Sequence, residues 1–374
     1  MVDRTPLSLP DFPWDTISEF AARARAHPDG LVDLSVGSPV DPTPEFIREA
    51  LSAATDAHSY PQTAGSVPLR EAIVAWYARR RGALLTVANV LPTIGSKELV
   101  SLLPLLLGLH EDDVVVQPTL AYPTYAIGAA LVGATVVSSD DPANWPENAR
   151  LIWLNSPSNP DGRVLGIEAL RTAVARAREL GAVIVNDECY AELTWPAAGE
   201  SDFPVPAPSI LDPQVIGQSR DHVLSVYSLS KQSNLAGYRA GFVAGCSDLI
   251  DEILAVRKHI GLMPPAPVQA AMVAALGDDA HVAAQRGVYF ERRSRLSAAL
   301  VAAGFRIDDS AAGLYLWATR SEDALATISW LAERGILAAP GSFYGDDPAI
   351  HVRLALTASD ADIARAVDRL TSSV

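Results

Sequence analysis

Lysine is rare in this chain of 374 residues, and one of its three lysines, Lys231, lies in a setting suited to covalent chemistry. The apolar run 223–228 ends in small hydroxyl residues shortly before Lys231, and the glycine-flanked Arg239 follows it. A lysine amine can lose its proton and form a Schiff base, whereas an arginine cannot be deprotonated at any useful pH. Taken alone, the segment is equally consistent with a solvated lysine in a loop after a strand.

Polar side chains follow two other apolar runs in a similar way. Asp187 ends the run 183–187, where a carboxylate is costly unless it is paired. A protonated heterocyclic nitrogen would supply that partner, although an isolated aspartate here is more often a helix cap. Asn155 and Asn159 follow the run 151–154 and could present side-chain amides to a cleft, but such residues are also common in plain turns.

The sequence favours a lysine-bound cofactor over other cofactor classes. Gly95 and Ser96 open a predicted helix, where backbone N–H groups can bind phosphate, although Ser96 could equally be an ordinary cap. The nucleotide-binding patterns G-x-G-x-x-G and G-x-x-x-x-G-K-[ST] do not occur, nor does the nucleophile elbow G-x-S-x-G. The seven histidines are scattered, and Cys189 and Cys246 form no metal-binding or disulfide pattern, so we expect no metal.

Composition narrows the possible partners. A net charge of −15 argues against binding to nucleic acid, which needs a basic patch. The 49% hydrophobic content is ample for a large core. The N-terminus lacks the apolar centre of a signal peptide, and the longest apolar stretch, 102–109, is too short to span a bilayer. We therefore expect a cytoplasmic enzyme that acts on small molecules, with neither a nucleic-acid nor a membrane partner.

The elements that position these residues alternate between short apolar runs and longer amphipathic segments, which is typical of an α/β fold with a largely parallel sheet. Ligands gather at the carboxyl ends of the strands in such sheets. The predicted strands are 90–93, 114–117, 135–138, 151–155, 183–187, 223–228 and 241–244, and the predicted helices between them include 96–107, 125–132 and 167–180.

A change in pattern after residues 263–267 predicts a second, smaller α+β domain. Its expected elements are helices at 281–303, 322–334 and 359–370 and strands at 314–318 and 351–356. We assign 31–280 to a large cofactor-binding domain, and 1–30 with 281–374 to the small domain. The proline-rich stretch 6–13 is expected to pack against the small domain, and 202–213 is expected to be a loop.

Together, in order and over nearly the whole chain, these motifs resemble the fold-type I, pyridoxal-phosphate-dependent aminotransferases of class I/II. The segment 228–241, with Ser-Leu-Ser-Lys followed by Gly-Tyr-Arg-Ala-Gly, looks like the family's cofactor-binding signature. The resemblance implies an α/β fold with a mostly parallel central sheet in a large domain and a smaller α+β domain. It also implies pyridoxal 5'-phosphate bound covalently to Lys231, which is the catalytic amine.

The resemblance further implies which residues hold the cofactor phosphate. Ser228 and Arg239 match two of its ligands. Ser96 and Lys97 match the cradle at a helix start. Tyr60 resembles the tyrosine that the family donates across a dimer interface, so a homodimer is expected.

Around the cofactor ring, Asp187 matches the aspartate that pairs with the pyridinium nitrogen, and Tyr190 matches the tyrosine that bonds the ring hydroxyl. Both are expected to take part in catalysis. Tyr122 falls where an aromatic side chain stacks on the ring, and Asn159 matches the asparagine that also reaches the ring hydroxyl.

On the substrate side, Arg353 matches the arginine that binds the substrate carboxylate, with Gly37 and Asn159 beside it. The runs 230–239 and 258–269 look most like actinobacterial-type N-succinyldiaminopimelate aminotransferases. The expected reaction moves an amino group between glutamate and N-succinyl-2-amino-6-oxopimelate by a ping-pong mechanism, in lysine and diaminopimelate biosynthesis. The stiff, apolar segment 263–265 is expected to border a roomy entrance for this long substrate.

Other substrates and other functions remain possible from the sequence. The amino donor or acceptor could instead be aspartate, an aromatic amino acid or histidinol phosphate, and a C–S β-lyase of the same fold is the nearest rival. A non-catalytic regulator with an aminotransferase-like domain would be expected to carry an added DNA-binding segment, and no basic helix-turn-helix stretch precedes Pro6 or follows Leu370.

Overall fold

The structure is a computed structural model, and it describes residues 9, 13–197, 202–345 and 349–372. Its largest element is a seven-stranded sheet with the strand order β2-β8-β7-β6-β5-β3-β4. The strands are β2 (Val90–Ile94), β3 (Val114–Gln117), β4 (Thr135–Ser138), β5 (Ala149–Asn155), β6 (Val183–Asp187), β7 (Val223–Ser228) and β8 (Ala240–Gly245).

The strands β4, β3, β5, β6 and β7 run parallel, and β8 is antiparallel to both of its neighbours, β7 and β2. A parallel strand covered on both faces needs mostly apolar residues, which explains why β5, β6 and β7 are largely apolar before their polar carboxyl ends. The prediction of a mostly parallel central sheet is therefore confirmed.

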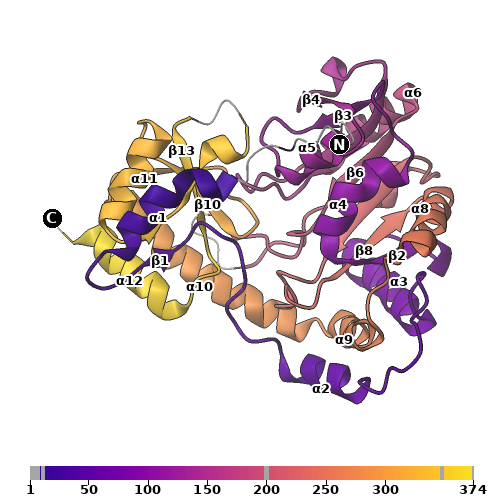
Figure 1. Ribbon diagram of the computed structural model, residues 1–374, viewed down its shortest axis with the longest axis horizontal. Coiled ribbons are helices and arrows are strands. Elements are labelled where there is room, and N and C mark those ends of the chain that lie inside the picture. The colour runs from indigo at the N-terminus through magenta and orange to yellow at the C-terminus, as the bar shows by residue number, and fades with distance from the viewer. Residues whose placement is uncertain (1–8, 10–12, 198–201, 346–348, 373–374) are drawn as a thin grey trace, which may run out of the picture.

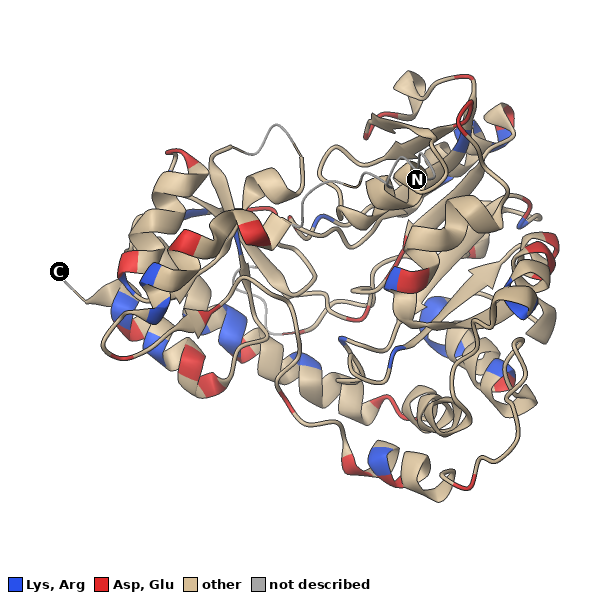
Figure 2. Cartoon of the chain, viewed as in Figure 1, with Lys and Arg blue, Asp and Glu red and all other residues tan. Residues whose placement is uncertain are grey.

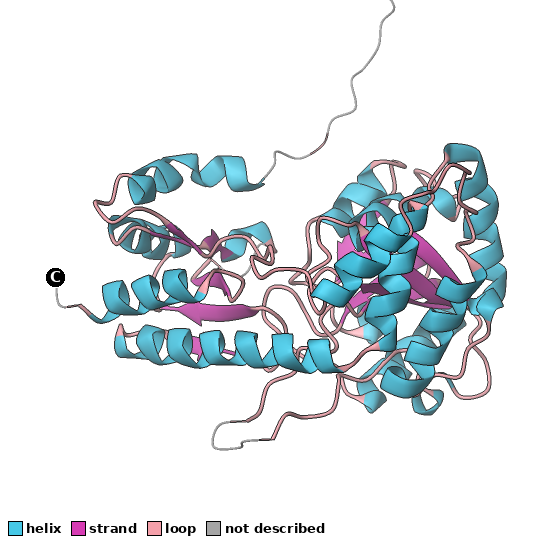
Figure 3. Ribbon diagram, turned by 90° about the horizontal axis from the view of Figure 1, so that it is seen from below, coloured by secondary structure: helices cyan, strands magenta, loops and turns pink. Residues whose placement is uncertain are grey.

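Helices cover both faces of this sheet (Figures 1 and 3). Alternate residues of the central strands belong to separate cores, so Trp153 packs with one layer of helices, and Leu154 with the other. The first layer contains α4 (Gly95–Leu106), α5 (Thr124–Ala130) and α8 (Ser247–Ile260). The second contains α3 (Val67–Arg81), α6 (Ile167–Leu180) and α9 (Ala266–Gly277), beside which lies α2 (Glu45–Ala53).

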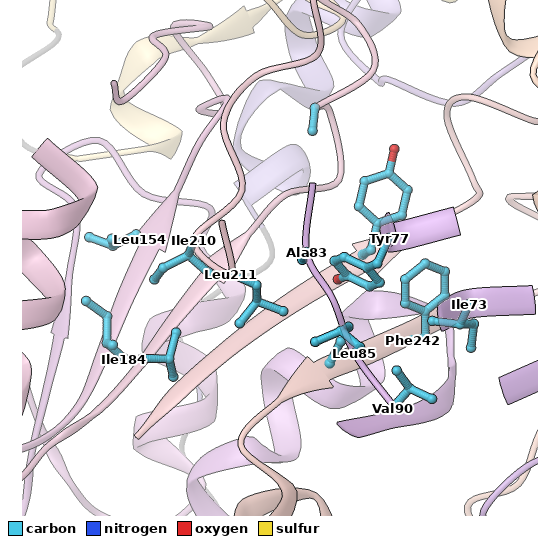
Figure 4. Close-up of a cluster of buried hydrophobic side chains, with 14 of the residues drawn as sticks. Ile73, Tyr77, Ala83, Leu85, Val90, Leu154, Ile184, Ile210, Leu211 and Phe242 are labelled. Carbon is cyan, nitrogen blue, oxygen red and sulfur yellow. The ribbon is translucent and has the colours of Figure 1, made fainter. Parts of the chain in front are cut away.

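Figure 4 shows part of the second core, where Ile73 and Tyr77 of α3 lie against Phe242 of β8. Tyr77 is fully buried, and its hydroxyl donates to Ser225 Oγ at 3.0 Å. Burial of large aromatic and aliphatic side chains on both faces fixes the sheet, and with it the carboxyl ends of its strands.

A second, antiparallel sheet has the strand order β12-β13-β10-β9. Its strands are β9 (Arg306–Asp308), β10 (Tyr315–Thr319), β12 (Ala339–Pro340) and β13 (His351–Ala355). The helices around it are α1 (Ser18–Arg25), α10 (Ala280–Ala302), α11 (Ala324–Glu333) and α12 (Asp360–Thr371). A third core of buried residues joins these elements and includes Leu34, Leu354 and Ile363.

Near the N-terminus, β1 (Val32–Asp33) pairs in parallel with β11 (Ile336–Leu337), so Val32 and Leu34 belong to the core beside the smaller sheet. The boundaries of the two domains at residues 31 and 281 remain a proposal. Of the proline-rich stretch 6–13, only Leu9 and Pro13 are among the described residues. The short helix η1 (Pro13–Ile17) buries Ile17 against Leu337.

Helix α10 links the two sheets (Figure 1). Near its start, the His281 ring hydrogen-bonds the hydroxyl of Ser233, with 2.8 Å between Nε2 and Oγ. Farther along, Arg292 pairs with Asp41 at 2.6 Å and with Asp360 at 2.7 Å. One helix therefore contacts the loop after Lys231, the segment around Asp41 and the start of α12.

Acidic and basic residues are interspersed along the helices (Figure 2). None of the helices in the described ranges is long and apolar enough to cross a membrane. The segment 202–212 forms neither helix nor strand, as expected, and the short helix α7 (Pro213–Ile216) follows it.

Candidate active site

A cavity of about 260 Å³ lies at the carboxyl edge of the seven-stranded sheet, where the strand ends and the loops after them meet. Asn155, Asp187 and Ser228 are the last residues of β5, β6 and β7, and all three line this cavity. Eleven of the twelve residues predicted from the sequence line it: Gly37, Ser96, Lys97, Tyr122, Asn159, Asp187, Tyr190, Ser228, Lys231, Arg239 and Arg353.

Lys231 lies in the connection between β7 and β8, and its Nζ donates to the carbonyl oxygen of Gly37. Burial lowers the pKa of the Lys231 amine, and the charges of Arg353 and Arg239 act in the same direction. A lower pKa leaves more of the amine in the neutral form that attacks a carbonyl carbon.

Asp187 is 6% exposed at the end of β6. Its carboxylate accepts hydrogen bonds from the Tyr125 hydroxyl at 3.1 Å and from the Cys189 amide at 3.2 Å. Burial raises the pKa of this carboxyl, and the hydrogen bonds offset only part of that effect. Since neither partner carries a positive charge, a protonated ring nitrogen in the cavity would satisfy the site.

Tyr125 is itself held by a stack on Trp153 of β5, with 4.9 Å between ring centroids and 19° between planes. Sequence analysis did not identify Tyr125 as part of the site. A tyrosine in the first turn of an apolar helix is indistinguishable from a core residue until the fold places it beside Asp187.

Backbone and side chains at the start of α4 form an anion cradle. Gly95 has φ +69°, a left-handed backbone conformation that strains residues with a side chain, and a Cβ there would meet the Arg239 guanidinium. Its amide donates to the Arg239 carbonyl at 2.7 Å. The Ser228 hydroxyl donates to Ser230 Oγ at 2.8 Å, and both serines line the cavity beside Ser96. Helix-start amides, three serine hydroxyls and a guanidinium suit a phosphate group.

Arg353, on β13 of the smaller sheet, reaches the same cavity and is 3% exposed. Its guanidinium donates to Asn159 Oδ1 at 2.8 Å and to the Ser35 carbonyl at 2.7 Å. Both acceptors are neutral, and among the described residues no carboxylate pairs with Arg353. A buried cation without a counterion is unfavourable, so the geometry suits a carboxylate brought by a ligand.

Six cavity residues escaped the sequence analysis, and Tyr315 of β10 is the most prominent. Its ring lies 3.8 Å from Arg353 Cζ, and its hydroxyl lies where a Cβ on Gly37 would be. The only sequence signal was a hydroxyl-bearing residue at the start of an otherwise apolar strand. The others are Trp14, Val36, Cys189, Ser230 and Ala236.

Two other expectations concern residues outside this cavity. Tyr60 is 96% exposed and does not line it. The prediction that 263–265 borders the entrance is wrong for the cavity of this chain, since none of these residues lines it. The neighbouring Ala266 instead lines a second cavity of about 590 Å³ together with Pro61 and Gln62. The segment therefore lies near Tyr60 rather than beside Arg353.

Comparisons with known proteins agree with this geometry. The family model for aminotransferase class I and II matches residues 29–370. A probable aminotransferase of Mycobacterium tuberculosis is 56% identical over 97% of this chain and 86% of its own length. The Streptomyces rimosus 4-dedimethylamino-4-oxo-anhydrotetracycline transaminase OxyQ is 52% identical over 97% of this chain and 99% of its own.

Among solved structures, N-succinyldiaminopimelate aminotransferase from Mycobacterium tuberculosis superimposes with a TM-score of 0.83 at 26% identity, covering 96% of each chain. The fold, the anion cradle and the unpaired Asp187 all suit pyridoxal phosphate. This chain belongs to the aminotransferases of class I and II and is a pyridoxal-phosphate-dependent aminotransferase.

Proposed function

We propose that this aminotransferase moves an amino group between glutamate and N-succinyl-2-amino-6-oxopimelate by a ping-pong mechanism, in lysine and diaminopimelate biosynthesis. The structural similarity to the N-succinyldiaminopimelate aminotransferase supports this substrate. The observation that carries the proposal is a fourth cation in the cavity, Lys97, in addition to Lys231, Arg239 and Arg353.

When bound, pyridoxal phosphate supplies an electron sink for the carbanion at the substrate α-carbon. We assign to Asp187 the role of keeping the ring nitrogen protonated, with Tyr190 at the ring hydroxyl. Arg353 and Asn159 orient the substrate carboxylate, so that the bond to be broken is held in a reactive direction. The Lys231 amine then carries the proton at the substrate α-carbon.

Lys97 is a cation of the cavity that has no role in these steps, so it is available to bind the substrate. Its backbone belongs to the cradle at the start of α4, but its exposed ammonium lies 5.9 Å from the centre of the Tyr122 ring. Across the described part of the chain, Lys97 forms no ion pair. The far carboxylate of a dicarboxylic substrate, with its first carboxylate on Arg353, could bind this ammonium.

Replacing Lys97 with methionine tests this assignment. Loss of a charged hydrogen bond should raise KM for N-succinyl-LL-diaminopimelate and for glutamate by about tenfold to a hundredfold. The KM of a monocarboxylic amino acid such as alanine should change little, because Arg353 binds its only carboxylate. Equal effects on all three substrates would contradict the assignment of Lys97.

The substrate itself is tested by steady-state kinetics with the wild-type enzyme. We expect kcat/KM for N-succinyl-LL-diaminopimelate to exceed the values for aspartate, phenylalanine and histidinol phosphate. A higher kcat/KM for one of these three substrates would mean that the enzyme is an aminotransferase with another substrate. Release of pyruvate and ammonia from cystathionine would instead favour a C–S β-lyase.

A second candidate acceptor is a polycyclic ketone. Two observations favour it: the 52% identity to the anhydrotetracycline transaminase, and the aromatic side chains of Trp14, Tyr122 and Tyr315 in the cavity lining. Flat rings pack well against aromatic side chains. Amination of 4-dedimethylamino-4-oxo-anhydrotetracycline at a higher kcat/KM than the succinylated acceptor would select this candidate.

We also propose that the enzyme is a homodimer in which Tyr60 completes the active site of the partner subunit. The support is the exposure of Tyr60 and Val67, at 96% and 50%, beside the second cavity that Pro61 and Ala266 line. Exposed apolar side chains that lie close together are common at protein–protein interfaces.

Tyr60→Phe should leave the dimer intact and weaken binding of pyridoxal phosphate about tenfold, because one hydrogen bond to the phosphate is lost. Equilibrium dialysis of the cofactor and sedimentation of the same samples provide the two measurements. A fully active monomer in the sedimentation experiment would refute the homodimer.

A further inference from the structure

Tyr315 is placed by strand register directly against Arg353. In the antiparallel pair of β10 and β13, Tyr315 lies opposite Ala355, so Arg353 is its diagonal neighbour. The guanidinium carbon lies 3.8 Å from the centre of the Tyr315 ring. Tyr344 contacts the same guanidinium more distantly, at 4.9 Å. The Tyr315 ring is therefore the closer aromatic support of the carboxylate-binding arginine.

The hydroxyl of Tyr315 extends from there towards Lys231. It lies 3.3 Å from the Tyr190 hydroxyl, and a Cβ on Gly37 would come within 2.1 Å of it. The Lys231 ammonium donates to the carbonyl oxygen of the same glycine. Tyr315 is 4% exposed, and a phenol buried so deeply is costly unless its hydroxyl is used.

The charges around Tyr315 distinguish it from the neighbouring tyrosine. Burial alone would raise the pKa of Tyr315, but Arg353, Lys231 and the hydrogen bond with Tyr190 outweigh burial and lower it. Burial raises the pKa of Tyr190 well above its usual value. Tyr315 is thus the member of the pair that loses its proton first. The titratable and charged groups that act on Tyr315, or on which it acts, are Arg353, Lys231, Tyr190, Cys189, Tyr122, Tyr289 and Tyr344.

We propose that Tyr315 is a positioning residue for both cations of the active site: its ring orients Arg353, and its hydroxyl, paired with Tyr190, controls when Lys231 becomes neutral. The inference rests on the proposed roles of Lys231 and Arg353. It assigns the ring and the hydroxyl of one side chain to different tasks, so two substitutions can separate them.

The hydroxyl is tested in the apoenzyme. Pyridoxal phosphate is added over a range of pH, and the rate of its covalent attachment is followed by borohydride trapping. In Tyr315→Phe, the midpoint of the rate increase with pH should fall by about one unit, because Tyr315 raises the pKa of the Lys231 amine and its hydroxyl is lost in this variant. Tyr344→Phe is the matched control, since it removes a buried hydroxyl near Arg353, and its midpoint should equal that of the wild type.

The ring is tested by the KM for glutamate. Tyr315→Phe retains the ring and should keep KM within about twofold of the wild type, whereas Tyr315→Leu should raise it roughly tenfold. Circular dichroism confirms folding of each variant. The proposal is overturned if folded Tyr315→Phe has an unchanged midpoint, or if the two variants share one KM.

The trapping readout involves no amino acceptor, and the KM for glutamate can be measured in the half-reaction of the cofactor-bound enzyme, so a wrong acceptor would leave both expectations unaffected. Failure of the wild-type apoenzyme to trap the cofactor on Lys231 would instead contradict the role of Lys231. The two failures are therefore distinguishable within one set of samples.

Discussion

Lys231→Ala should abolish amino transfer, lowering turnover by at least about a thousandfold, and should leave pyridoxal phosphate bound without a covalent link. The reason is that the Lys231 amine lies in the cavity, where burial lowers its pKa, whereas the side chains of Lys97 and Lys258 are exposed. The measurement is turnover with glutamate, combined with borohydride reduction and peptide mapping of the labelled residue.

Lys258→Ala provides the matched control. Lys258 is exposed near the end of α8, and it does not line the cavity, so its removal should change neither turnover nor the labelled peptide. A reduced adduct mapped to Lys97 or Lys258 in the wild-type enzyme would contradict the assignment of Lys231.

Asp187→Ala should fold and still bind the cofactor, but its turnover should fall by roughly a hundredfold or more, as is typical of losing a preorganised charge partner. The carboxylate is buried and is bonded only to neutral donors, so its charge is available for a protonated ring nitrogen. Steady-state kcat, with cofactor content measured on the same sample, checks this expectation.

Asp187→Asn separates charge from shape at this position. Its side chain can still accept the hydrogen bond from Tyr125, yet it lacks the negative charge, so its loss of turnover should approach that of the alanine variant. Near-normal turnover in either variant would show that Asp187 is not the partner of the ring nitrogen.

Several elements of the fold could be predicted because their sequence patterns are local. The predicted ranges of β3, β4, β6, β7 and α6 match the structure residue for residue. The strands β1, β9, β11 and β12 were not predicted, since two or three residues carry no periodicity. Their stability comes from distant pairing, as when the Val32 amide donates to Gly335 O at 2.8 Å.

The candidate site also divides into residues with a local sequence signal and residues that depend on distant pairing. Residues within distinctive motifs, such as Lys231 and Arg239, were identified because glycines and hydroxyl residues surround them at fixed spacing. Tyr315 was not identified, because its importance comes from the register between β10 and β13, and one sequence does not reveal that register. The location of 263–265 was misjudged for a related reason, since proximity along the chain does not specify which cavity a segment borders.

The residues that line the cavity come from two sheets with separate hydrophobic cores, and this arrangement bears on thermal unfolding. Asp187 and Ser228 end strands of the larger sheet, whereas Arg353 and Tyr315 belong to the smaller one. A molecule held by both groups acts as a non-covalent cross-link between two bodies that could otherwise unfold at different temperatures. Because ligand that binds only the native state adds RT ln(1 + [L]/Kd) to its stability, saturation with a dicarboxylate should merge two calorimetric transitions into one.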